Sequence, residues 1–233
     1  DWSSDVCSSD LRDLVPLVSW LSTKGHCRYC RKKLSVSYPL TELLLGVTFA
    51  VSYIVWQYAL TTTAQIALFI TWLVSLVLLC GLFVYDLRWF ILPNKLVYPL
   101  VATSVVFAAL YTYSFGDFTV ETLFSYLLSV LVAAGFFLLL YVLSQGKWIG
   151  DGDIRLGVAI GLFTGNWVAS WLVIFIASLV GILLVLPTLL RTRQKQTLKM
   201  KVPFGPLLII GLYITVLYGQ LLIDWYTTEV LLL

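Results

Sequence analysis

Three aspartates stand at the ends of long apolar runs in this chain of 233 residues. Asp86 closes one run, and Asp151 and Asp153 lie in a Gly-Asp-Gly-Asp segment that opens another. Because an aspartate at mid-bilayer costs about 2.5 to 3.5 kcal/mol, acids in such places call for a functional explanation. Two facing carboxyl groups can hydrolyse a peptide bond, since an ionised one takes a proton from water and a protonated one polarises the carbonyl. That chemistry needs neither a metal nor a nucleophilic serine.

Breaks in the backbone beside these acids would let them meet. Pro93 and Asn94 interrupt the chain after the first aspartate, and Gly150 and Gly152 allow a sharp turn around the second pair. We therefore expect both loops to fold back and to bring carboxyl groups together.

Ordinary structural roles remain open for each acid taken singly. Asp86 could pair with Arg88, and Asp151 or Asp153 could cap the next helix, because aspartate is favoured at that position. A different class of function, a small ion-coupled transporter or proton channel, also uses intramembrane carboxylates. We find no inverted repeat in the sequence that would favour transport.

The composition places most of the chain in lipid. Hydrophobic residues make up 60% and charged residues 12%, against about a quarter charged in soluble domains. A membrane-crossing helix needs roughly 20 mainly apolar residues, and six windows qualify: 40–59, 64–85, 96–113, 120–143, 167–190 and 204–223. A seventh, 154–163, contains Gly157 and Gly161 and reads as a half-helix or a tight span packed against its neighbours. The sequence predicts an all-α polytopic membrane protein with six to seven transmembrane helices.

The basic residues predict the orientation. If the amino-terminal segment is cytoplasmic and the chain crosses seven times, every lysine and arginine falls on the cytoplasmic side. Without a crossing at 154–163, the basic segment 191–201 would move to the opposite side, so the charge pattern favours the seventh span. We interpret segment 191–201 as a solvated loop that fixes topology. All three acids then lie at the cytoplasmic face.

We interpret the first eleven residues as non-native. Residues 1–11 have no features of a signal peptide and match the translation of a sequencing adapter. We expect genuine sequence to begin near Arg12, with the natural amino end missing before it; whether that end includes another span stays open.

A Cys-x-x-Cys pair lies in the basic loop that follows. The spacing of Cys27 and Cys30 lets two thiolates hold one zinc ion, although two ligands do not complete a structural site. His26 is a weak third candidate because adjacent side chains diverge, and a redox dithiol would lack its usual βαβ setting. We expect half of a zinc site in a small cytoplasmic loop domain.

Several motifs in a fixed order resemble the type IV prepilin peptidases, which are membrane aspartyl proteases. The motifs are Cys27-Arg-Tyr-Cys30, Tyr38-Pro-Leu-Thr-Glu42, Asp86 with Leu92-Pro-Asn94, Gly150-Asp-Gly-Asp153 and Pro203-Phe-Gly-Pro206. The resemblance covers nearly all of the chain from Arg12 to about Ile223, and it implies that Asp86 and Asp153 are catalytic. Asp151 falls at the variable position of the Gly-x-Gly-Asp motif.

The resemblance also implies residues that bind substrate or shape the site. Glu42 would orient the substrate amine, unless a neighbouring base simply neutralises it. The other members of this set are Pro93, Asn94, Gly150, Gly152 and Arg155, the last standing where relatives commonly have lysine. Presenilin-like proteases also pair two aspartates, but they lack the Cys-x-x-Cys and Leu-Pro-Asn motifs.

The implied activity is removal of a short basic leader from prepilins or pseudopilins of pili, secretion or DNA uptake. It would take place at the cytoplasmic face of the bacterial plasma (inner) membrane, with the lipid bilayer and the substrate as partners and no nucleic acid. Proteolysis needs no cofactor, whereas many relatives then N-methylate the new amino terminus with S-adenosylmethionine. Bifunctional relatives also have an upstream Cys-x-x-Cys that completes a structural Zn(2+) site, and this chain shows only half of it.

The expected organisation has four parts. Residues 1–11 are non-native, 12–39 form the cytoplasmic basic loop, 40–226 form the transmembrane aspartyl peptidase domain, and 227–233 form a short extracytoplasmic tail.

Overall fold

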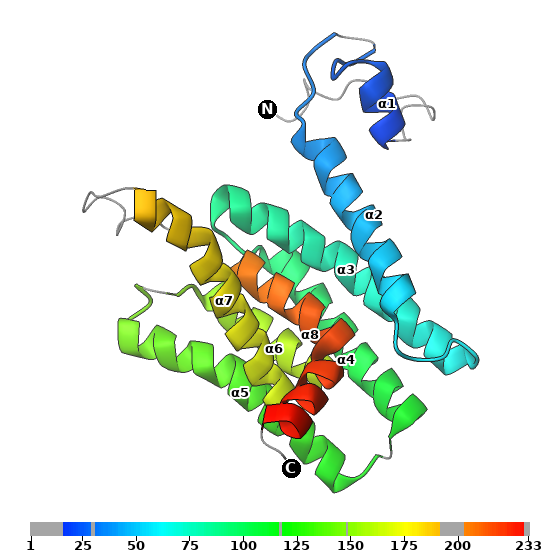
Figure 1. Cartoon of the computed structure of the whole chain (residues 1–233), viewed down its shortest axis with the longest axis vertical. Helices are drawn as coiled ribbons and strands as arrows, with labels where there is room; N and C mark the ends of the chain where they lie inside the picture. The colour runs from blue at the N-terminus through cyan, green and yellow to red at the C-terminus, as the bar shows by residue number, and fades with distance from the viewer. Residues whose placement is uncertain (1–15, 29–30, 117, 148, 192–202, 231–233) are drawn as a thin grey trace. The chain divides into compact units, whose positions relative to one another are not determined.

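The computed structural model of the chain describes residues 16–28, 31–116, 118–147, 149–191 and 203–230 (Figure 1). Within these ranges the secondary structure is helical, apart from one isolated β-bridge between His26 and Lys33. The predicted all-α class is confirmed. The chain divides into two compact units, Asp1–Ile54 and Val55–Leu233, which we describe separately.

The first unit contains a short helix, a tight loop and most of a longer helix. Helix α1 spans Pro16–Ser22 and helix α2 spans Ser37–Val55. In the loop, the Leu34 N–H donates to the Gly25 carbonyl at 2.8 Å, and the Cys27 N–H donates to the Lys32 carbonyl at 2.9 Å. Gly25 has a φ of +74°, a left-handed conformation that glycine adopts without strain.

The second unit is a bundle of long helices. They are α3 (Thr63–Trp89), α4 (Asn94–Phe115), α5 (Val120–Ser144), α6 (Asp151–Thr164), α7 (Trp167–Arg191) and α8 (Gly205–Trp225), followed by the π-helical turn η3 (Tyr226–Val230). Helix α3 begins with a capping box between Thr62 and Gln65. It ends at Phe90, whose left-handed φ of 54° stops the helix and whose N–H donates to the Asp86 carbonyl.

Among the residues that the structure describes, five helices are long and apolar enough to cross a membrane, which supports a multi-pass membrane protein. They are Thr63–Trp89, Asn94–Phe115, Val120–Ser144, Trp167–Pro187 and Gly205–Glu229, and they match five of the six predicted windows. The window at 40–59 forms α2, whose apolar part Pro39–Val55 is shorter than these five. Segment 154–163 lies in α6, which has only 14 residues. The crossing of six to seven helices stays a prediction.

Helix α6 packs against α5 at backbone distance. A Cβ added to Gly161 would lie 2.4 Å from the Cα of Val130, and one added to Gly157 would lie 2.9 Å from the Cα of Ala134. Glycines at this spacing let two helices approach closely in a membrane protein. The Ser129 hydroxyl strengthens the same contact by donating to the Gly161 carbonyl at 2.9 Å. The expected tight packing of segment 154–163 is therefore confirmed.

Candidate active site

Asp86 occupies a buried position in the last turn of α3. Its exposed fraction is 6%, and it is the only charged side chain among the buried residues in the described part of the chain. The backbone N–H of Gly205, at the start of α8, supplies a hydrogen-bonding contact to its carboxyl group. The contact is so close that a Cβ on Gly205 would lie 2.5 Å from Asp86 Oδ2. The amino-terminal end of α8 therefore holds this carboxylate with a backbone dipole.

Asp153 lies in the first turn of α6, ahead of the apolar stretch 154–163, and interacts electrostatically with Asp86. Burial, and after it the charge of Asp86, raises the pKa of Asp153 to about 7. A like charge has this effect only at short range, because it disfavours a second ionised group beside it. The structure thus brings together two aspartates that are far apart in the sequence, as the glycine and proline breaks predicted.

Leu92, in the α3–α4 loop, packs against the starts of the two helices beside these acids. A Cβ added to Gly152 would lie 2.8 Å from the Leu92 Cβ, and one added to Gly205 would lie 3.6 Å from Leu92 Cδ2. The α3–α4 loop is therefore packed against the starts of both α6 and α8. Glycine at 152 is required by this close approach.

Arg155 connects α6 to the beginning of α4. Its guanidinium donates to Asn94 Oδ1 and forms an ion pair with Asp151 Oδ2 at 2.7 Å. The same group lies over the ring of Tyr98, 5.6 Å from the ring centre, where a cation–π attraction operates. Asp151 therefore pairs with Arg155 at the surface.

Two of the predicted site residues occupy helix starts. Pro93 is the N-cap of α4, and its carbonyl accepts from Leu96 and Val97, so the predicted chain break is the start of a helix. Gly150 is the N-cap of α6. The alternative that Asp151 or Asp153 caps this helix is wrong, since both lie inside its first turn. Acids in that turn are nevertheless favoured by the helix dipole.

The other predicted site residues belong to the first unit. Glu42 is exposed on α2, and its role in orienting substrate stays a prediction. Cys27 is half-buried, whereas Cys30 lies outside the described residues. The ring of His26 is hydrogen-bonded to the Lys24 carbonyl at 3.0 Å. Among the described residues no three potential ligands gather around one point, so the half-site reading stays a prediction.

Sequence reasoning missed the contributions of Gly205 and Leu92. Both stand inside motifs that carried the family resemblance, but neither side chain has chemistry that would single it out. The available signal was the Pro203-Phe-Gly-Pro206 motif, in which a glycine precedes the proline that starts α8.

Comparison with known proteins gives matches along most of the chain. Residues 3–58 match the Bacterial Peptidase A24 N-terminal domain, and residues 73–186 match the Type IV leader peptidase family. A protein of Aeromonas salmonicida named prepilin leader peptidase/N-methyltransferase is 32% identical over 93% of this chain and 70% of its own length. Proteins of the same name from Pseudomonas aeruginosa and Stutzerimonas stutzeri are 30% and 29% identical, each over 92% of this chain and 70% of their own length. No solved structure matches significantly.

Proposed function

The chain belongs to the type IV leader peptidase family. We therefore propose that it is a membrane aspartic endopeptidase that removes the leader from prepilins or pseudopilins, with Asp86 and Asp153 as its catalytic pair. The observation that carries the proposal is the interaction of the buried Asp86 carboxyl group with the half-buried Asp153 carboxyl group at one end of the bundle. Carboxylates of a transporter would instead follow a path across the membrane. No comparison favours transport or a presenilin-like protease.

The environments of the two acids suggest different roles. Asp153, whose pKa is raised to about 7, would hold the shared proton and donate a hydrogen bond to the carbonyl of the scissile peptide. Asp86 would be the ionised partner, because its charge is one cause of the raised pKa of Asp153, and it would take a proton from the attacking water. The water oxygen then bonds to the carbonyl carbon. As it does so, Asp153 passes its proton to the carbonyl oxygen and a gem-diol forms. When the C–N bond breaks, the proton held by Asp86 passes to the leaving nitrogen, and Asp153 takes a proton back from a hydroxyl of the gem-diol as the carbonyl reforms.

The site is proposed to lie at the cytoplasmic face of the bacterial inner membrane. Its parts come from the carboxyl end of α3 and the amino ends of α4, α6 and α8, which all lie at one end of the second unit. The basic residues Arg88, Lys95 and Arg155 accompany these ends in the sequence, as the positive-inside rule requires of a cytoplasmic surface. A short basic leader retained on that side would present its scissile bond to the pair.

N-methylation is proposed as a second activity, on the name of the relatives and the match of residues 3–58. S-adenosylmethionine would be its methyl donor. Cys27 and Cys30 would contribute two thiolates to a structural zinc ion, which would stabilise the loop around them. Proteolysis by two carboxyl groups is proposed to proceed without either cofactor.

The test is co-expression of the full chain with a tagged prepilin, with leader loss followed by gel shift and mass spectrometry. Asp86→Asn and Asp153→Asn should each lower cleavage about 10²- to 10⁴-fold, the usual contribution of a general acid or base. Asp151→Asn is the matched control, because it removes a neighbouring carboxylate that pairs with Arg155 at an exposed site. It should lose at most about fivefold, since such an ion pair contributes about 1 kcal/mol or less. Cleavage that persists at the wild-type rate in either Asp86→Asn or Asp153→Asn would overturn the proposed pair.

A further inference from the structure

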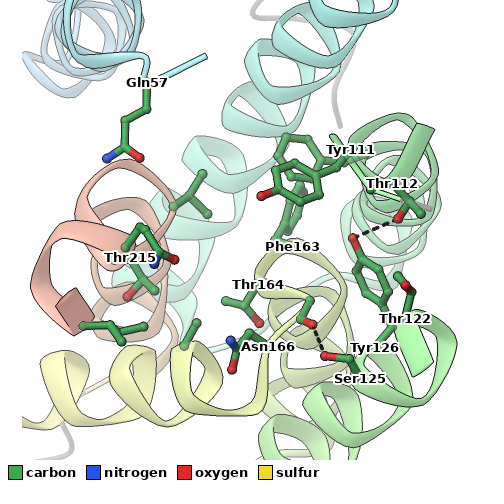
Figure 2. A pocket seen from close by; sticks show the side chains of 18 of the residues that line it. Gln57, Tyr111, Thr112, Thr122, Ser125, Tyr126, Phe163, Thr164, Asn166 and Thr215 are labelled. Atoms are coloured by element: carbon green, nitrogen blue, oxygen red, sulfur yellow. Dashed lines mark hydrogen bonds between the residues drawn. The ribbon is translucent and has the colours of Figure 1, made fainter. Parts of the chain in front are cut away.

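A cavity of about 470 Å³, lined in part by hydroxyl groups, lies at the end of the second unit opposite to Asp86 and Asp153. Figure 2 shows side chains that line it. Helix α6 runs from Asp153 in its first turn to Thr164, which lines the cavity at its last residue. Helix α8 likewise runs from Gly205 to Gln220 at the cavity. Its size is in the range of small-molecule sites. The cavity is therefore distinct from the proposed peptidase site.

The short length of α6 explains why a hollow forms at this end. Its 14 residues extend roughly 21 Å, less than the hydrocarbon core of about 30 Å, whereas α5 with 25 residues is longer than that core. Gly165 ends α6 with a left-handed φ of +59°, and Asn166 leads directly into α7. Both residues line the cavity. The α6–α7 turn thus forms one polar side of the cavity, and it is recessed relative to the ends of the longer helices.

Several hydroxyl groups around the cavity have weak hydrogen bonds or none, so they could form hydrogen bonds with a ligand. The Tyr58 and Tyr111 hydroxyls are 3.4 Å apart, and the Tyr126 hydroxyl lies 3.4 Å from the Ala108 carbonyl, both long for O–H···O bonds. The Thr215 hydroxyl has no hydrogen-bond partner although the residue is only 5% exposed. Such a buried group is destabilising unless a ligand or water satisfies it. Figure 2 shows Tyr111, Tyr126 and Thr215 on different sides of the cavity.

The charge and the aromatic rings of the lining favour a cation. Glu121 is the one charged residue among the described residues that line the cavity, and no lysine or arginine is found there. The rings of Phe107, Tyr111 and Phe163 also line it and offer π faces. An anion could accept hydrogen bonds from the hydroxyl and amide groups, but it would be repelled by the carboxylate and by the negative faces of these rings. A positively charged group with several N–H donors would satisfy the carboxylate and the hydroxyl oxygens together.

We propose that this cavity binds an organic ammonium group. The group would be held by Glu121, by the hydroxyls of Tyr58, Tyr111, Tyr126 and Thr215, and by the neighbouring rings. Two sources supply this chemistry at a membrane surface: the ethanolamine headgroup of a phospholipid, and a free alkylamine. The site is independent of peptide hydrolysis, because it lies at the opposite ends of α6 and α8 from the aspartates.

The test uses the full chain, stripped of lipid in a maltoside detergent and studied by native mass spectrometry and calorimetric titration. The probes are a short-chain phosphatidylethanolamine, a phosphatidylglycerol of equal chain length, and ethanolamine. We expect phosphatidylethanolamine to bind at least about tenfold more tightly than phosphatidylglycerol, a difference of about 1.4 kcal/mol. Glu121→Gln should lower the affinity for ammonium compounds by a similar factor. Glu229→Gln, which removes an exposed acid at the same end that does not line the cavity, should leave it unchanged.

The outcomes separate the two sources of the ligand. Binding of phosphatidylethanolamine without ethanolamine would support the proposal and identify a lipid headgroup, and binding of both would support it with a free amine as a second ligand. Thr215→Val serves as a second variant, because it keeps the shape of the side chain and removes only the unpartnered hydroxyl. Absence of ammonium binding in the wild type, equal binding of the two lipids, or wild-type affinity in Glu121→Gln would overturn the proposal.

Discussion

The Cα of Gly205 lies against the carboxylate of Asp86, so closely that any side chain at position 205 would collide with it. The Cβ of an alanine would be 2.5 Å from Oδ2 and 3.3 Å from Cγ of the aspartate. The neighbouring atom belongs to a short, buried side chain at the end of α3, which has little room to turn away. Glycine at this position therefore sets where one of the two proposed catalytic carboxylates lies.

Gly205→Ala should inactivate the peptidase without unfolding it. The added methyl displaces the Asp86 carboxylate, and a misplacement near 1 Å can lower a rate about 10²-fold. Cleavage of a prepilin in proteoliposomes measures the loss, and thermal unfolding of the same sample checks the fold. Gly46→Ala is the control, because a Cβ there meets nothing within 4 Å. Full activity in Gly205→Ala would show that the Asp86 carboxylate has no required position.

Two substitutions of Arg155 should distinguish the contribution of its positive charge from that of its planar guanidinium group. The guanidinium joins Asn94 of α4 to Asp151 of α6, and an ammonium group has no planar fork with which to reach both. Arg155→Lys should retain cleavage within about fivefold, as expected for the loss of one exposed polar contact. Arg155→Ala should lose more and should also lower the thermal stability. Equal activities for the two variants, measured at equal amounts in the membrane, would contradict a role for the charge.

The rate of cleavage should fall as the pH rises through about 7. Burial and the charge of Asp86 raise the pKa of Asp153 from 3.8 to about 7, so the carboxyl group is protonated below this pH and ionised above it. If Asp153 supplies the proton that polarises the substrate carbonyl, activity is lost when that proton leaves. Initial rates between pH 5 and 9 in proteoliposomes would show the descending limb.

The charge of Asp151 provides a check on this assignment. Asp151 also raises the pKa of Asp153, though less than burial or Asp86. Asp151→Asn should therefore move the descending limb slightly to lower pH. A descending limb that shifts to higher pH in Asp151→Asn, or a wild-type rate that keeps increasing to pH 9, is incompatible with Asp153 as the proton donor.

Gly161→Ala should destabilise the bundle. The methyl would lie 2.4 Å from the Cα of Val130 and would force α5 and α6 apart, an overpacking that typically costs about 1 to 3 kcal/mol. The midpoint of unfolding in detergent measures the change. Gly135→Ala on α5 is the control, because its nearest neighbour would be Leu131 Cγ at 3.9 Å. A lowered midpoint in the control alone would mean that the close α5–α6 contact is not a source of stability.

The positions of the helices were largely predictable because their composition is so apolar. Five of the predicted windows correspond to helices of membrane-crossing length, and the Gly-rich segment 154–163 forms a helix that packs tightly. The exact ends were harder to predict. Helix α4 begins already at Asn94, since Pro93 serves as its N-cap and the predicted break is also a start signal.

The approach of Asp86 and Asp153 followed from the breaks beside them, but the groups around them did not follow from the sequence. Gly205 and Leu92 act through shape, and a glycine or a leucine in an apolar chain is too common to single out. The cavity at the other end was equally hidden, because its lining comes from several helices and depends on how far α6 extends. Hydropathy reports the apolar content of a helix, not the space that a shorter helix leaves behind.

The glycine contact between α5 and α6 has a mechanical consequence. Two helices in contact at the backbone have no layer of side chains between them that can slide or tilt, so α5 and α6 should move as one rigid body. Asp153 belongs to this rigid body, whereas Asp86 belongs to α3. Any movement of the α5–α6 pair relative to α3 would therefore change the separation of the two aspartates.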